Sequence, residues 1–205
     1  MVVTRQLALG AFAGLALLAL AALLVSVRQN DSATLINATL LPEPRAIGPF
    51  SLLDEQGAVF DNAALRGRWT LMFFGFTNCP DVCPLTLQQL TAARSALREQ
   101  GRTPLPDILL VSVDPERDTQ ATLAAYVAHF GDGVRGARGD LPALQQLTGD
   151  IGIFFQREPG DADRYQVSHS AAVLLVNPAG ELRAVLAAPQ QVPALINDLP
   201  LLMAN

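Results

Sequence analysis

Hydrophobic residues are concentrated in one uninterrupted run near the start of the chain. Leu7 to Val27 spans 21 residues without a charge, and Ser26 carries its single hydroxyl. A helix of that length rises about 30 Å, which matches the hydrocarbon thickness of a bilayer. The run exceeds the roughly 7–15 apolar residues of a signal peptide, and Val25-Ser26-Val27 is a poor cleavage site. We therefore expect an uncleaved membrane anchor over residues 1–28, with a cleaved signal peptide as the alternative.

Polar residues and two prolines, Pro42 and Pro44, follow this run. That composition predicts a linker over residues 29–48. Residues 50–53 and 58–60 are short apolar segments on either side of Asp54-Glu55-Gln56-Gly57, and they predict a β-hairpin with a polar turn.

An apolar run rich in aromatics, Trp69 to Phe76, predicts a strand buried on both faces. It leads directly into the segment that contains Cys79 and Cys83. Apolar residues then recur at helical spacing as far as Gly101. The cysteines are therefore predicted to lie where a strand passes into a helix.

The rest of the chain alternates between apolar segments typical of strands and segments with helical periodicity. The predicted elements are a strand at 108–113, helices at 119–130 and 141–147, a strand at 151–155, a hairpin of 171–176 and 182–187, and a helix at 192–202. This order is typical of an α/β fold with a central mixed sheet flanked by helices. We expect one thioredoxin-like domain over residues 49–205.

The net charge is −5, and the basic residues are scattered rather than gathered in a stripe, so no nucleic-acid partner is expected. Arg5 and Arg28 flank the apolar run on both sides, which leaves the positive-inside signal nearly balanced. Too few residues precede the run for an Arg-rich transit peptide. The expectation is a single-pass protein of the bacterial inner membrane. Its soluble domain is placed on the periplasmic side, mainly because of the thiol chemistry considered next.

Cys79 and Cys83 are four residues apart at the predicted start of a helix. Within one helical turn they would share a face, about 6 Å apart along the axis. That spacing allows a disulfide or a shared metal ion. Pro84 suits the first helical position, and the helix start favours a thiolate at Cys83. A redox-active or metal-binding pair is the preferred interpretation, and a structural disulfide or two buried thiols is the alternative.

The chain contains two histidines. His129 lies in a helical segment and is expected at a surface or helix end. His169 directly precedes a predicted strand, and in thioredoxin-like folds the loop entering that strand faces the cysteine turn. Two thiolates and one imidazole suit copper, and they could also hold zinc with an open fourth position. The residues alone leave the metal undecided.

At these residues the chain resembles the Sco/SenC family of copper chaperones. The resemblance covers residues 45–200 together with the anchor. Its most specific part is the pair of cysteines separated by three residues, where ordinary thioredoxins have two. The matching segments are Phe74 to Pro84, Val113 to Thr119 and Tyr165 to Ser170.

The resemblance implies one copper ion, as Cu(I) or Cu(II), bound by Cys79, Cys83 and His169. It also implies a role in building the binuclear copper centre of cytochrome c oxidase. The implied partners are the copper-bearing subunit of that oxidase and another copper chaperone or a thiol reductant. Family members often carry His where this chain has Asn78, and Asp where it has Ser168. These differences leave the ligand set intact but could shift copper affinity or redox potential.

Two functions remain open. The first is a metallochaperone that uses all three ligands, and the second is a thiol–disulfide oxidoreductase in which Cys79 and Cys83 act as a catalytic redox pair without metal. A disulfide-stapled membrane adaptor is a third, weaker hypothesis. Whether the protein is strictly an enzyme is left undecided. Asp114 and Asp118 are interpreted as loop-turn and helix-cap residues rather than as supports of the site.

Overall fold

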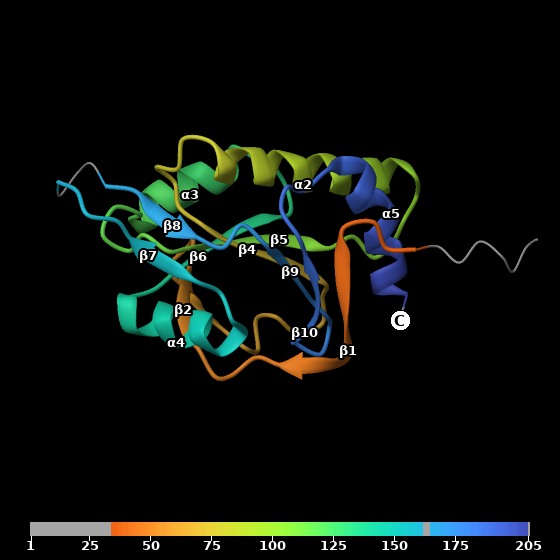
Figure 1. The fold of residues 1–205 in the computed structure, drawn as a ribbon, viewed down its shortest axis with the longest axis horizontal. Coiled ribbons are helices and arrows are strands. Elements are labelled where there is room, and N and C mark those ends of the chain that lie inside the picture. Colours follow the sequence, from red (N-terminus) through yellow and green to blue (C-terminus); the bar gives the residue numbers. More distant parts are fainter. Residues whose placement is uncertain (1–33, 162–164, 205) are drawn as a thin grey trace, which may run out of the picture. The chain divides into compact units, whose positions relative to one another are not determined.

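The computed structural model describes residues 34–161 and 165–204, and the chain from Leu35 onward forms one unit (Figure 1). The expected anchor, Leu7 to Val27, lies outside the described residues. Within the described residues, no helix combines the length and the apolar character needed to cross a bilayer.

An eight-stranded mixed sheet forms the centre of this unit, with the strand order β1-β10-β9-β4-β5-β6-β2-β3. The strands β4, β5 and β6 run parallel to one another, and the remaining pairings are antiparallel. The bounds are β1 Ala38–Ala46, β2 Ser51–Asp54, β3 Val59–Asp61, β4 Thr70–Gly75, β5 Asp107–Ser112, β6 Val134–Arg138, β9 Val173–Val176 and β10 Glu181–Leu186.

Helices cover both faces of the sheet (Figure 1). The helices are α2 Val82–Glu99, α3 Gln120–Ala128, α4 Leu141–Ile151 and α5 Val192–Met203. Because parallel crossovers are right-handed, the two that run through α2 and α3 place both helices on one face. There α2 packs against α5, while α4 lies on the opposite face. All six residues of β4 are consequently buried, as expected for a strand covered on both sides.

The helix α2 presents one apolar stripe to the sheet. Its buried residues recur at three- and four-residue intervals, and each fully buried leucine contributes about 1.5–3 kcal/mol relative to an exposed one. They are Cys83, Thr86, Leu87, Leu90, Ala93 and Leu97. Cys83, in the first turn, is therefore the first residue of the buried face of α2.

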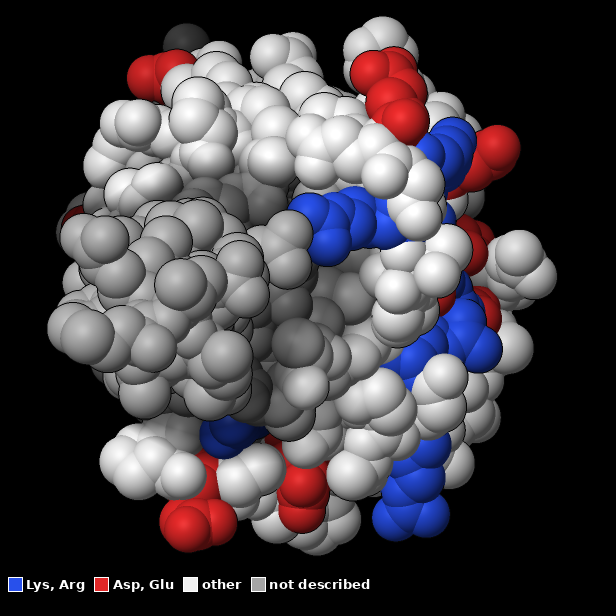
Figure 2. Space-filling model, turned by 90° about the vertical axis from the view of Figure 1, so that its right-hand side faces the viewer, with Lys and Arg blue, Asp and Glu red and all other residues white. Residues whose placement is uncertain are grey.

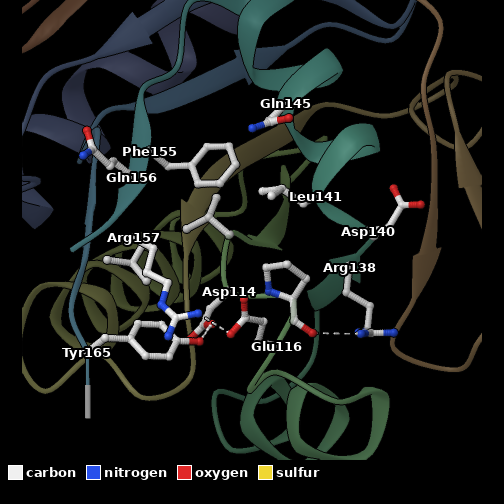
Figure 3. Close-up of a pocket in the computed structure, with 14 residues that line it drawn as sticks. Asp114, Glu116, Arg138, Asp140, Leu141, Gln145, Phe155, Gln156, Arg157 and Tyr165 are labelled. Carbon is white, nitrogen blue, oxygen red and sulfur yellow. Dashed lines mark hydrogen bonds and ion pairs between the residues drawn. The ribbon is translucent and has the colours of Figure 1, made fainter. Parts of the chain in front are cut away.

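A separate two-stranded sheet projects from this body and is formed by β7 Phe155–Arg157 and β8 Val167–His169. The strands are antiparallel, with Phe155 opposite His169. This hairpin brings His169, at the end of β8, toward the main sheet. A cavity of about 580 Å³ lies against the hairpin, and it is lined by the β5–α3 loop, the segment from the end of β6 into the start of α4, and residues of β7 and β8 (Figure 3).

The predicted linker over residues 29–48 is wrong for its second half. Ala38 to Ala46 forms β1, which pairs with β10 at one edge of the main sheet. Pro42 and Pro44 fall where the pairing register shifts between Leu40 and Arg45. Proline has no N–H for a ladder hydrogen bond, so an irregular edge strand accommodates it. The domain thus begins before residue 49, at about Leu35.

The predicted strand at 151–155 is also wrong. Ile151 ends α4, Gly152 terminates that helix with a left-handed φ of 78°, and β7 begins only at Phe155. The strand β6 was not predicted, because Val-Arg-Gly-Ala-Arg lacks an apolar pattern. Gly136 is required there, since a Cβ would lie 2.7 Å from Cγ of Leu123 on α3. The other predicted helices and hairpins are confirmed to within a few residues, as is the α/β fold with a mixed sheet flanked by helices.

Charged side chains on the described surface mix both signs. On the face shown in Figure 2, arginine and acidic side chains are interspersed, and most of the described surface is uncharged. Ion pairs such as Arg68 with Asp107 and Arg157 with Glu116 are partly exposed. Exposed pairs of this kind contribute little to stability, so the apolar core carries the fold.

Candidate metal centre

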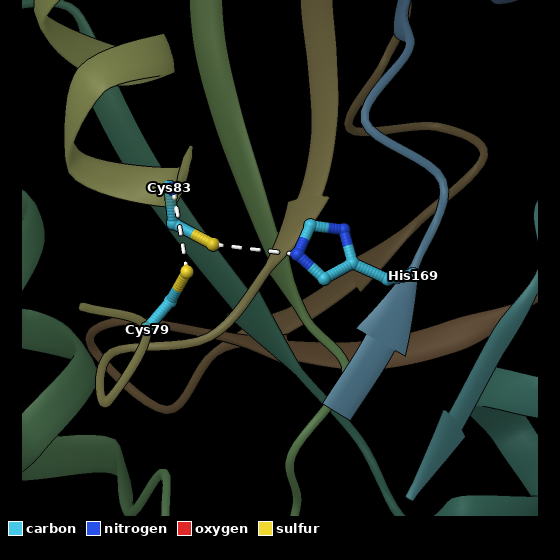
Figure 4. Close-up of side chains that lie close together, drawn as sticks. All are labelled: Cys79, Cys83 and His169. Carbon is cyan, nitrogen blue, oxygen red and sulfur yellow. Dashed lines mark hydrogen bonds between the residues drawn. The ribbon is translucent and has the colours of Figure 1, made fainter. Parts of the chain in front are cut away.

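Cys79 and Cys83 lie where β4 passes into α2, as the sequence predicted (Figure 4). The Cys79 N–H donates to the carbonyl of Phe76, which tightens the turn, and Asp81 occupies the N-cap position of the helix. Cys83 is the second helical residue, so Pro84 takes the third position rather than the first. Both thiols are free; Cys79 is half-buried and Cys83 is fully buried.

The two cysteines are already in contact. The Cys83 N–H donates to Sγ of Cys79 over 3.4 Å. This contact orients the Cys79 sulfur toward the helix start, where free N–H groups and the helix dipole stabilise negative charge.

His169 completes the group from the other side (Figure 4). Its Nε2 lies 3.5 Å from Sγ of Cys83, and its Nδ1 lies 3.0 Å from the carbonyl oxygen of Ser170. Because a carbonyl only accepts, Nδ1 carries the proton and Nε2 is left with its lone pair facing the sulfur. The rings of Phe73 and Phe76 contact the imidazole edge-on and restrict its orientation.

The ligand atoms of Cys79, Cys83 and His169 all lie within 4.8 Å of one another. Within residues 34–161 and 165–204, this is the one group of three or more Cys, His, Asp or Glu side chains close enough to hold a metal ion. An ion at about 2.0–2.3 Å from each ligand needs ligand atoms about 3.5–4 Å apart. The arrangement therefore fits one metal ion after small side-chain shifts. Two sulfurs and one imidazole favour a soft cation such as Cu(I).

Burial dominates the chemistry of Cys83. Desolvation raises the pKa of its thiol far above the ordinary range, and the hydrogen bond with Cys79 adds to this increase. The expectation that the helix start favours a Cys83 thiolate is thus wrong for the metal-free protein. A metal ion that binds here has to displace the proton, so binding is coupled to proton release.

Asp118 supports the cysteine turn and is not a helix cap. Thr119 caps α3 by accepting from the N–H of Thr122. The Asp118 carboxylate is fully buried and accepts from the N–H and hydroxyl of Thr77 and from the hydroxyl of Ser112. The sequence favoured a helix cap over this supporting role, because the two Thr77 donors come from a segment 41 residues away that meets Asp118 only in the folded chain.

Tyr126 is a second residue that the sequence did not indicate. Its hydroxyl is buried and has no hydrogen-bond partner among the described residues. Burial raises the pKa of this phenol, and the neighbouring Cys83 and Cys79 raise it further. The hydroxyl donates to neither thiol. His129, by contrast, is exposed at the end of α3 and takes no part in the group, as expected.

The group opens to solvent through a shallow cavity of about 280 Å³, which Phe76, Pro80, Val82 and Ala171 help to line. A partner protein could reach Cys79 and His169 through this opening. Asn78 and Ser168, the two positions at which the chain departs from the Sco/SenC pattern, are both exposed. The larger cavity of Figure 3 lies beyond β8 and contains neither thiols nor imidazole.

Together, the fold and the site define a thioredoxin-like protein with a dithiol–imidazole group at the start of a helix. The SCO1/SenC family model matches residues 39–204. The chain belongs to the SCO1/SenC family.

Relatives of known name agree with this assignment. A protein of Stutzerimonas stutzeri, named as a candidate copper-binding protein, is 37% identical over 193 residues, which cover 93% of this chain and 94% of that protein. The mitochondrial SCO2 homologue of Bos taurus is 40% identical over 134 residues, which cover 65% of this chain and half of the bovine protein. The crystal structure of Arabidopsis thaliana ScoI with copper bound superposes with a TM-score of 0.71 at 31% identity, and the match covers 77% of this chain and 98% of that one.

Proposed function

We propose that this protein is a membrane-anchored copper metallochaperone. It delivers copper to the binuclear centre of cytochrome c oxidase, reduces the cysteines of that centre, or does both. The single observation that carries the proposal is the convergence of two thiols and one imidazole nitrogen within 4.8 Å. The copper-bound Arabidopsis relative supports the choice of copper over zinc.

Copper is the cargo in this proposal. The reduced protein binds one Cu(I) through Sγ of Cys79, Sγ of Cys83 and Nε2 of His169, and the thiols release their protons as the metal enters. Cys79 and His169 are partly exposed, whereas Cys83 is buried. Ligand exchange with a recipient therefore starts at Cys79 or His169, and Cys83 releases the ion last.

Thiol reduction uses the same pair. The Cys79 sulfur attacks a disulfide of the recipient, and the mixed disulfide is resolved by Cys83. The products are a Cys79–Cys83 disulfide and two recipient thiols, so two electrons and two protons pass to the recipient. Because the oxidised pair has no thiolates to offer, it cannot bind Cu(I) in this way, and redox state gates metal loading.

Copper binding is tested by competition against a chromogenic Cu(I) chelator. We expect one Cu(I) per reduced chain, none bound by the oxidised chain, and loss of binding in Cys79→Ser and Cys83→Ser. His169→Ala should weaken binding by at least tenfold. His129→Ala is the matched control, because this exposed histidine lies outside the group, and it should bind as the parent does. Binding by His169→Ala at the parent's affinity would refute the three-ligand site.

The alternative is a thiol–disulfide oxidoreductase that works without metal. The contact between the Cys83 N–H and Sγ of Cys79 favours it, since it already brings the two cysteines together. In that case the protein would reduce a mixed-disulfide substrate in the presence of a metal chelator. His169→Ala would then leave the rate unchanged.

The proposed location is the bacterial inner membrane. Leu7 to Val27 would form the single span, and the domain from about Leu35 would lie in the periplasm, close to the oxidase subunit that receives copper. The length and apolar character of the run support this arrangement. Fractionation and protease protection of spheroplasts test it, and a domain protected from external protease would refute the orientation.

A further inference from the structure

One loop contacts both segments that carry the proposed copper ligands. We call residues 112–118, at the end of β5 and before α3, the clamp loop. On one side, the Asp118 carboxylate accepts from Thr77 N at 3.0 Å and from Thr77 Oγ1 at 2.6 Å. Thr77 lies two residues before Cys79, so this contact fixes the start of the cysteine turn.

On its other side, the clamp loop holds Tyr165, four residues before His169. The Arg117 guanidinium donates from Nη1 to the carbonyl of Tyr165 at 3.0 Å, and from Nε to the carboxylate of Asp114. The Tyr165 hydroxyl donates to the same carboxylate. The Asp114 and Arg117 side chains are only 2% and 16% exposed, so the pair is shielded from solvent screening.

Ser112 joins the two halves of the loop. Its hydroxyl donates to Asp118 at 2.6 Å and accepts from the N–H of Asp114 at 3.2 Å. The contacts to Thr77 and to Tyr165 therefore share one buried anchor, Ser112.

Arg117 also lies over an aromatic ring from each of the two segments. Its guanidinium carbon lies 3.7 Å from the ring centre of Tyr165 and 5.7 Å from that of Phe76. The Phe76 ring in turn contacts the His169 imidazole, with ring centres 5.9 Å apart. Arg117 thus connects the cysteine turn to the histidine strand through packing as well as hydrogen bonds.

We infer that Arg117, held by Asp114, is a positioning residue that sets the distance between Nε2 of His169 and the two cysteine sulfurs. The inference rests on the proposed function, because that distance matters only if the three groups bind the same metal ion. Metal sites tolerate ligand displacements of about 0.5 Å. Loss of supporting residues around a site typically lowers metal affinity by about 10–100-fold.

Arg157 provides a matched control. Its guanidinium carbon lies 3.9 Å from the ring centre of Tyr165, as close as that of Arg117 (Figure 3). Two guanidinium groups so close to one ring centre can only lie on opposite faces of it. Arg157, however, pairs with the exposed Glu116 and contacts neither Asp114 nor the Tyr165 carbonyl. Removing Arg157 therefore removes the stacking on Tyr165 and the exposed ion pair with Glu116, but it leaves the contacts of Arg117 with Asp114 and with the Tyr165 carbonyl in place.

The experiment is a double-mutant cycle on Cu(I) affinity in the full-length reduced protein, with Arg117→Ala, His169→Ala and the double variant. Arg117→Ala should weaken binding by about 10–100-fold. In the His169→Ala background it should cause almost no further loss, because it acts through His169. Arg157→Ala should bind as the parent does. Arg117→Lys keeps the positive charge and the aliphatic part of the side chain, but it loses the guanidinium that donates to Asp114 and to the Tyr165 carbonyl at once. It should therefore also weaken binding.

Amide hydrogen exchange of residues 165–170 provides a readout without copper. Arg117→Ala and Arg117→Lys should exchange faster there than the parent and Arg157→Ala. Equal losses from Arg117→Ala with and without His169, or unchanged exchange in both Arg117 variants, would overturn the inference. A parent protein that binds no Cu(I) would instead refute the proposed function, and the exchange measurement would still decide whether Arg117 holds the histidine strand.

Discussion

Tyr126 and Tyr165 allow one chemical change to be made at two positions with opposite expected results. The Tyr126 hydroxyl is buried without a hydrogen-bond partner among the described residues. The Tyr165 hydroxyl donates to the Asp114 carboxylate, and burial together with this bond raises the pKa of Tyr165 to about 12, so it remains a donor across the physiological range. Replacing each tyrosine with phenylalanine removes only the hydroxyl.

The expected magnitudes follow from these environments. A buried polar group without a partner costs about 1–3 kcal/mol, so Tyr126→Phe should raise the free energy of unfolding by about 1 kcal/mol. A hydrogen bond to a charged group contributes about 1.5–3 kcal/mol, so Tyr165→Phe should lower it by about 2 kcal/mol. For a domain of this size, 1 kcal/mol corresponds to a change of about 2–4 °C in Tm.

Urea unfolding of the reduced protein, with a chelator present, measures both values. Trp69, the single tryptophan, is buried and reports the transition by fluorescence. The two variants must keep the parent's m-value for the comparison to hold. A Tyr126→Phe variant less stable than the parent would refute this reasoning, because it would show that the hydroxyl has a partner.

Three further predictions concern the surroundings of the thiols. Because burial raises the pKa of Cys83 above its ordinary value of 9.0, the folded chain keeps a proton that the unfolded chain loses. The contribution of the protonated Cys83 thiol to the free energy of unfolding should be fully present below about pH 9 and should be lost as the pH rises further. When urea unfolding is measured across this pH range, Cys83→Ala should show a smaller decrease in the free energy of unfolding than the parent. Gly75→Ala places a Cβ 2.9 Å from Sγ of Cys83, so it should cost about 1–3 kcal/mol and weaken Cu(I) binding, whereas Gly149→Ala, with nothing within 4 Å, should do neither. The Asp118 carboxylate accepts three hydrogen bonds, and Asp118→Asn replaces one of its oxygens with an NH2 group that cannot accept. This substitution should lower the free energy of unfolding by about 2–4 kcal/mol and speed amide exchange at Thr77. Exchange equal to the parent's would exclude Asp118 as the anchor of the turn.

The elements predicted well from the sequence are those whose signals are local. The buried strand β4, the helix α2 and the β9–β10 hairpin each carry their own apolar period or turn residues. The strands β1 and β6 and the β7–β8 hairpin were missed or misplaced. Each of these depends on a distant partner, as β1 does on β10, and the local pattern of Pro42, Pro44 or Gly136 disfavours a strand.

The same division applies to the site. The sequence by itself determined that the two cysteines lie where a buried strand passes into a helix, because the apolar run of β4 and the helical period of α2 are local signals. Only Cys83 is on the helix, since Cys79 precedes the N-cap residue Asp81, so the expected shared helical face is wrong. The approach of His169, 86 residues beyond Cys83, depended on the resemblance and on the sheet order that places β9 beside β4. Only the tertiary structure decided that Asp118 accepts from Thr77 in the cysteine turn, that Arg117 donates to the Tyr165 carbonyl, and that Cys83 is fully buried. It also left the buried Tyr126 hydroxyl without a partner among the described residues. Burial and side-chain hydrogen bonding between distant segments exist only once the chain has packed, so no local pattern encodes them.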